Sequence, residues 1–175
     1  MSRPVNRYKA FIDYVINRSK NDNKFSSEIR RASNPTFEAG GWETLVQFNI
    51  SLDFKHTRRA YLIMAAAAVQ SKIAEDGTIG IGRALALSYA ENQSDDQAKA
   101  RLRRLLACTS LEDVNMVIRP MLTFVQSRKV TNLNYSGILK QLDGYHFDQD
   151  KVRAQWATEF YTYGKVTGGD TNGGT

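Results

Sequence analysis

The stretch "DGTIGIGRALALS", residues 76–88, decides between two fold classes because two of its glycines flank an isoleucine ahead of a helix-forming run. A dinucleotide-binding fold needs a third glycine or alanine at the right spacing, a preceding apolar strand and an acidic residue about 20 residues later. Gly80 and Gly82 fill the first two positions, but Leu85 stands at the third, and the turn-forming "AEDGT" precedes them. The Gly-Lys-Ser/Thr of a Walker motif is also absent. The stretch therefore predicts a helix that begins after a turn.

The start of this predicted helix also has the features of an anion site. Open N–H groups at a helix N-terminus attract anions, and glycines beside them let another backbone approach closely. Arg83 lies in the first turns, where the helix dipole mildly disfavours a cation. We therefore expect this segment to hold a phosphate together with Arg83, or else to pair Arg83 with a local acid such as Asp76.

Helical spacing of apolar residues appears in every long segment, and no segment alternates strongly between apolar and polar positions. The apolar "AYLIMAAAAV", residues 60–69, is too short to span a bilayer and predicts a buried core helix. A first helix is expected from Pro4 to Asn17, followed by a polar loop over "NRSKNDNK". The residues expected to cap or begin later helices are Asp53, Thr78, Ser94 with Gln97, Ser110 with Asp113, Asn134 and Asp148.

These signals predict an all-α fold of eight or nine helices. Pro120 lies inside the helix that begins after Ser110 and is expected to kink it. The Gly/Thr-rich tail "GKVTGGDTNGGT", residues 164–175, is expected to be disordered.

Composition favours a negatively charged partner and a reducing compartment. The formal net charge is +6, which suits nucleic acid, anionic lipid or an acidic protein. The single cysteine, Cys108, excludes an intrachain disulfide and favours a cytoplasmic location. Charges run throughout the first 20 residues, so no signal peptide is expected there.

The segment "DQAKARLRRLLAC", residues 96–108, is an unusually basic predicted helix. Its apolar stripe is Ala98, Leu102, Leu105 and Leu106. The cations that border the stripe on its two sides are Lys99 with Arg103 and Arg101 with Arg104. A solvated helix face usually mixes charges of both signs, so cations without acids favour a polyanion. The stripe is short and lacks aromatic residues, which argues against a membrane surface.

Catalytic and metal-binding patterns are missing from the sequence. His56 and His146 lie far apart, and one cysteine cannot form a cysteine zinc site. No Gly-x-Ser-x-Gly motif occurs, and Glu112-Asp113 is better explained as the acidic start of a helix. We therefore predict no catalytic residues, no metal, no cofactor and no enzyme activity.

Several motifs, in this order and spacing, resemble one known family. They are "SSEIRRAS", "GIGRALAL", "ARLRRLLAC", "VNMVIRPMLTFVQS" and "KVRAQWATEFY". Across most of residues 5–163 the chain resembles CasB, the small subunit of the type I-E CRISPR surveillance complex Cascade. The Gly-Arg-Ala-Leu-Ala run and the late Trp-Ala are the most specific parts of the resemblance.

The resemblance implies two packed helical bundles, an N-terminal lobe at residues 1–91 and a C-terminal bundle at residues 92–163. It implies that two copies lie head to tail in Cascade beside the other subunits and that they are not nucleases. It also implies that basic residues hold the guide RNA and the displaced non-target DNA strand, which stabilises the R-loop. The nucleic-acid-binding residues carried over by motif position are Arg30, Arg31, Arg83, Arg101, Arg104 and Arg119.

The sequence therefore predicts a non-catalytic subunit that binds RNA and single-stranded DNA without sequence preference. R-loop formation is a near-balanced exchange of one duplex for another, so modest contacts to the phosphate backbone can shift it. Two alternatives stay open. A helical transcription regulator would need a recognition helix and a preferred base sequence. A structural adaptor that binds only protein would carry an incidental basic surface.

Overall fold

A computed structural model describes residues 6–89 and 95–167, and the described chain is all-α, as predicted. Its helices are α1 (Arg7–Asn21), α2 (Asn23–Ala32), the 3-10 helix η1 (Pro35–Gly41), α3 (Trp42–Gln47), α4 (Lys55–Ser71), α5 (Ile81–Leu87), α6 (Asp95–Leu106), α7 (Leu111–Ser127), α8 (Tyr135–Asp143) and α9 (Gln149–Thr167). Within the described residues, the one strand-like pairing is an isolated parallel bridge between Ile79 and Leu133.

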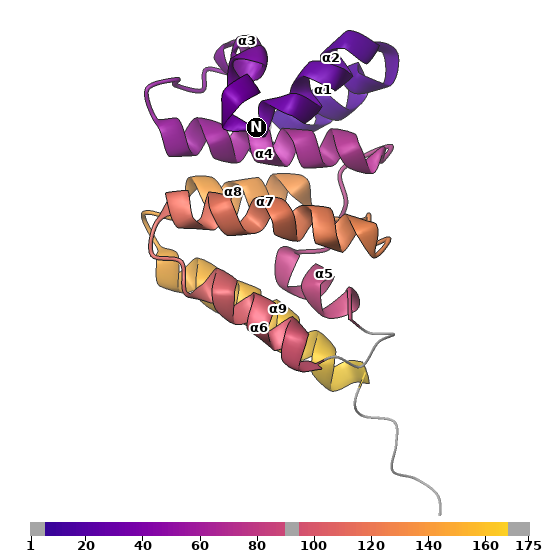
Figure 1. The fold of residues 1–175 in the computed structure, drawn as a ribbon, viewed down its shortest axis with the longest axis vertical. Coiled ribbons are helices and arrows are strands. Elements are labelled where there is room, and N and C mark those ends of the chain that lie inside the picture. The colour runs from indigo at the N-terminus through magenta and orange to yellow at the C-terminus, as the bar shows by residue number, and fades with distance from the viewer. Residues whose placement is uncertain (1–5, 90–94, 168–175) are drawn as a thin grey trace, which may run out of the picture.

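The helices are stacked in layers around α4 (Figure 1). One side of α4 is covered by α1, α2 and α3, and the other side by α7 and α8. The long helices α6 and α9 lie beyond α7 and α8, together with α5. Because α4 is covered on both sides, every residue from 60 to 69 is buried, which confirms the predicted core helix.

One connected core runs through all the layers. Buried apolar residues from Phe11 in α1 to Phe160 in α9 form a single cluster. The short helix α5 belongs to the predicted N-terminal lobe, yet its main packing partner is α9 of the predicted C-terminal bundle. The division at residue 91 stays a prediction.

Several helix boundaries differ from those expected from the sequence. The predicted polar loop after Asn17 is wrong because α1 continues to Asn21 and α2 starts at Asn23. Asp22 makes this short joint possible, since its carboxylate accepts a hydrogen bond from the Phe25 N–H at 2.9 Å. Asp53 does not cap α4, which begins after Phe54 without a side-chain cap.

The caps predicted for the second half are confirmed where the structure describes them. Ser110 accepts from the Asp113 N–H at 3.1 Å, and Asp148 accepts from the Lys151 N–H at 3.3 Å. Pro120 lies inside α7, as expected. The predicted roles of Pro4 and Ser94 fall outside the described residues. Helix α9 extends through 164–167, and the rest of the predicted tail also lies outside them.

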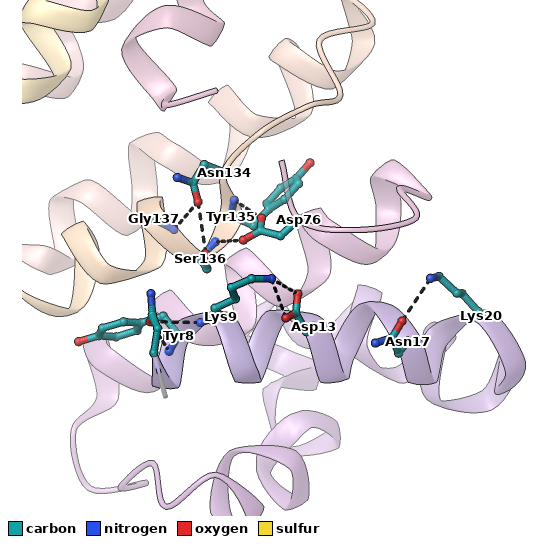
Figure 2. Close-up of polar contacts among 11 residues, drawn as sticks. Tyr8, Lys9, Asp13, Asn17, Lys20, Asp76, Asn134, Tyr135, Ser136 and Gly137 are labelled. Carbon is teal, nitrogen blue, oxygen red and sulfur yellow. Dashed lines mark hydrogen bonds and ion pairs between the residues drawn. The ribbon is translucent and has the colours of Figure 1, made fainter. Parts of the chain in front are cut away.

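The start of α8 is held by two side chains from different segments (Figure 2). Asn134 accepts from the Gly137 N–H at 2.8 Å, which confirms the predicted cap. The Asp76 carboxylate accepts from the Tyr135 N–H at 2.8 Å and the Ser136 N–H at 3.2 Å. Asp76 therefore anchors α8, and the expected pairing with Arg83 is wrong.

Candidate nucleic-acid interface

The glycine-flanked start of α5 packs against α9. A Cβ atom added to Gly82 would lie 2.1 Å from the Trp156 carbonyl oxygen, so no side chain fits at this position. The Glu159 carboxylate accepts a hydrogen bond from the Gly82 N–H at 3.0 Å. It also accepts from the Arg83 N–H. The predicted capping role of Thr78 is therefore wrong, because the distant Glu159 carboxylate accepts from the first N–H groups of α5.

The predicted phosphate site at the start of α5 is therefore wrong, because the protein's own carboxylate fills it. Burial raises the pKa of Glu159, and the hydrogen bonds from Gly82 and Arg83 oppose that shift. The Arg83 side chain is exposed and lies over the Tyr163 ring, with 5.6 Å between its guanidinium carbon and the ring centroid. Arg83 is thus available at the surface without the anion site that was expected beside it.

The arginines of the described chain divide into two groups. The first group forms ion pairs, which are Arg7–Asp143, Arg18–Asp22, Arg58–Glu38, Arg59–Glu38 and Arg153–Asp150. The second group is exposed and forms no ion pair with any described carboxylate. Its members are Arg30, Arg31, Arg83, Arg101, Arg103, Arg104, Arg119 and Arg128. All six predicted site residues belong to this second group.

Two predicted residues that are distant in sequence meet at one groove. Arg30 at the end of α2 and Arg119 in α7 both line a hollow of about 210 Å³ that residues of α4 also line. Arg119 also lines an adjacent hollow of about 740 Å³, and Ile63 of α4 lies in the wall of both. The structure therefore brings these two arginines to the same surface.

The other predicted residues lie apart from this groove. Arg31 stacks over the Phe37 ring, with 4.2 Å between the guanidinium carbon and the ring centroid. Arg101 and Arg104 are on α6, in the far layer, and Arg83 is on α5. The six residues consequently do not form one compact patch, and an extended ligand is needed to reach several of them.

Arg101 shares an aromatic ring with Arg128, which was not among the predicted site residues. Its guanidinium carbon lies 4.0 Å from the centroid of the Phe124 ring, and that of Arg128 lies 5.3 Å from the same centroid. The Arg101 Nε–H donates to the Tyr89 hydroxyl oxygen at 2.6 Å. The signal for Arg128 was its position four residues after an aromatic residue near the end of a helix.

Other chemistry-bearing residues do not assemble into a second site. In the described part of the chain, no group of three or more His, Cys, Asp or Glu side chains could hold a metal ion. Burial raises the pKa of the Cys108 thiol, which disfavours the reactive thiolate. None of the described helices is long and apolar enough to span a membrane.

The structure thus defines a class of protein, a layered helical protein whose distinctive surface feature is a set of exposed arginines that pair with no described carboxylate. Residues 26–161 match the family model described as CRISPR-associated protein Cse2. The fold is similar to the crystal structure of M. ruber CasB, with a TM-score of 0.74 and 16% sequence identity over 95% of this chain and 98% of that chain. No curated protein matches.

Because the family model covers most of the sequence, this chain belongs to the Cse2 family of CRISPR-associated proteins. This assignment confirms the resemblance to the CasB small subunit of type I-E Cascade. The protein is therefore a structural subunit of a Cascade complex, and the other Cascade subunits are its partners. The helical transcription regulator is no longer an alternative.

Proposed function

We propose that this Cascade subunit is non-catalytic and binds the phosphate backbones of the guide RNA and the displaced DNA strand without reading their sequence. The observation that carries the proposal is the set of exposed arginines that form no ion pair with a described carboxylate. Each phosphate that such a residue neutralises releases condensed counterions, which supplies affinity that does not depend on base identity. Sequence is read by base pairing in the R-loop, so base-edge contacts from this subunit are unnecessary.

The arrangement of the arginines suits a long ligand. The groove that holds Arg30 and Arg119 lies in the α2–α4–α7 region, whereas Arg101 and Arg104 lie on α6. A single strand that follows the surface can contact these residues in turn. Two copies in head-to-tail arrangement would lengthen the cationic track, as the family resemblance implies.

The proposal is tested by binding of mixed-sequence single-stranded DNA and RNA across a salt series, for the isolated protein and for assembled Cascade. The Arg30→Gln/Arg119→Gln variant is expected to lower the slope of log affinity against log salt by about 1.4, the value for two phosphates on a single strand. The matched control is Arg18→Gln/Arg153→Gln, which removes the same charge from ion-paired positions and is expected to change the slope little.

Three results would contradict the proposal. A strong preference among the tested sequences would mean that bases are read. Equal slopes for the two double variants would remove Arg30 and Arg119 from the interface. Absence of salt-dependent binding to either nucleic acid, in the isolated protein and in Cascade alike, would make the subunit a protein-only adaptor.

A further inference from the structure

Two arginines from different helices share one aromatic ring at the junction of α6 and α7. Arg101 lies in α6, and Arg128 caps the end of α7, where Phe124 supplies the ring. Both guanidinium carbons lie within 5.3 Å of the ring centroid, so the two cations are about one Debye length apart or closer. Neither has an ion pair with a described carboxylate, so their mutual repulsion is not offset within this part of the protein.

Among the described residues, the groups that hold Arg101 in this position are neutral. Its Nε–H donates to the hydroxyl of Tyr89, whose side chain is buried and whose ring lies 5.3 Å from the Phe124 ring. The Tyr89 hydroxyl oxygen thus occupies one donor of the guanidinium, whose carbon lies close to the Phe124 ring. No described residue accepts from the terminal N–H groups of Arg101, which can donate a forked pair of hydrogen bonds to a ligand such as a phosphate.

The same construction occurs elsewhere in the protein with an acid included. The Arg18 guanidinium carbon lies 4.3 Å from the Phe25 ring centroid, and its Nη1–H donates to the Tyr14 hydroxyl at 2.8 Å. There Asp22 lies 3.4 Å from Arg18 and balances its charge. The Phe124 cluster contains a second arginine and no described acid, so we expect the balancing anion to come from a ligand.

A purely structural role explains only part of this arrangement. A cation at the end of α7 favours the negative end of the helix dipole, and this accounts for the position of Arg128. It does not account for Arg101, which comes from the middle of α6 and stacks more closely on the same ring.

We propose that Arg101 and Arg128 together bind one phosphodiester group of a nucleic-acid backbone, with Phe124 and Tyr89 holding the pair in place. The inference rests on the proposed function and deepens it, because it names a two-arginine phosphate site and adds Arg128 to the interface. The site is on the opposite side of α4 from α1, α2 and α3. Arg101, Phe124 and Arg128 do not line the groove of Arg30 and Arg119, whose described lining on α7 is Arg119, Leu122, Thr123 and Gln126.

The test compares Arg101→Gln/Arg128→Gln with Arg18→Gln/Arg153→Gln as the charge-matched control, using single-stranded DNA and RNA of one mixed sequence. The double variant is expected to lose about tenfold in affinity and to lower the salt slope by about 0.7, which corresponds to one phosphate. The control variant is expected to leave the affinity and the salt slope unchanged. If the double variant loses affinity for only one of the two nucleic acids, the site binds that nucleic acid, and the proposal is still supported.

The outcomes separate this inference from the proposed function. If wild-type protein binds with a steep salt dependence but the double variant matches it, the two-arginine site alone is wrong. A slope loss near 1.4 would mean two separate phosphates and would overturn the shared site. Poly-glutamate serves as a probe for an acidic protein segment. If the double variant binds poly-glutamate more weakly than wild type does but binds DNA and RNA equally well, the ligand is an acidic protein segment and the proposed phosphate site is wrong.

Two further variants separate ligand binding from folding. Tyr89→Phe removes the hydroxyl that holds the Arg101 Nε–H but keeps the ring, and it is expected to weaken binding less than the double variant. Phe124→Leu removes the platform for both guanidinium groups. If the double variant unfolds at the same temperature as the wild type, its loss of binding is not a loss of structure.

Discussion

Glu159 shows how one residue can satisfy a helix start from a distant part of the chain. Its carboxylate takes the N–H of Gly82, and the absence of a side chain at that glycine lets α5 approach the α9 backbone. The glycines that resemble a phosphate loop therefore serve helix packing. Burial raises the pKa of Glu159, so proton binding to this group depends on folding.

Replacing Glu159 with Gln tests this coupling. The folded protein binds the Glu159 proton more tightly than the unfolded chain, because its pKa in the folded state is raised above the ordinary value of 4.5. This group's contribution to stability is thus fully present below that value and is lost as the pH rises through the folded-state pKa. Wild type should lose stability relative to Glu159→Gln as pH rises above 4.5, measured as unfolding free energy in urea. A constant difference between the two proteins would contradict this.

At the scale of the element, local signals were enough for three caps whose side chain accepts from an N–H three residues later, although the equally local Asp22 cap of α2 was missed. Ser110, Asn134 and Asp148 were predicted correctly for this reason. Thr78 and Asp53 were predicted wrongly because α5 takes its cap from α9 and α4 begins without one. Sequence spacing cannot reveal a partner that only tertiary packing brings near.

The candidate interface follows the same rule. The exposed, acid-poor arginines of α6 could be predicted from the helical pattern of one segment. The meeting of Arg30 with Arg119, and of Arg101 with Arg128, could not, because each pair joins two helices through packing.

The double anchoring of α8 gives a prediction for this element. Asp76→Ala removes the acceptor of two backbone N–H groups and is expected to cost about 1–2 kcal/mol of unfolding free energy. Asp76→Asn keeps one acceptor oxygen and should cost about half as much. Asp13→Ala is the control, because Asp13 pairs only with exposed Lys9 on the surface of α1. Chemical denaturation measures all three, and a loss for Asp76→Ala no larger than the control would refute the anchoring role.

At the scale of the whole molecule, we expect the continuous core, and not the division into layers, to determine how the protein unfolds. The two tryptophans lie at opposite ends of the stack: Trp42 begins α3 in the first layer, and buried Trp156 lies in α9 in the last. The Trp156 Nε1–H donates to the Gln141 side-chain oxygen at 2.8 Å. Each tryptophan reports on one end of the same core.

We expect the whole molecule to unfold in one cooperative transition. Trp156→Phe leaves Trp42 as the fluorescent probe, and Trp42→Phe leaves Trp156. In each variant the fluorescence midpoint in denaturant should coincide with the midpoint from circular dichroism, because the layers share one core. Separate midpoints for the two ends would instead support two lobes that unfold independently, as the predicted division at residue 91 would allow.

The bond between Gly82 and Glu159 also sets an order in time during synthesis. The two residues are 77 positions apart, so the amide of Gly82 leaves the ribosome long before its acceptor exists. At about 5–20 residues per second, the interval is roughly 4–15 s. During that interval α1 to α4 can pack against one another. Helix α5 cannot complete its packing until α9 has been synthesised. A ribosome that stalls before residue 159 therefore holds a chain whose first layers are complete and whose α5 is not.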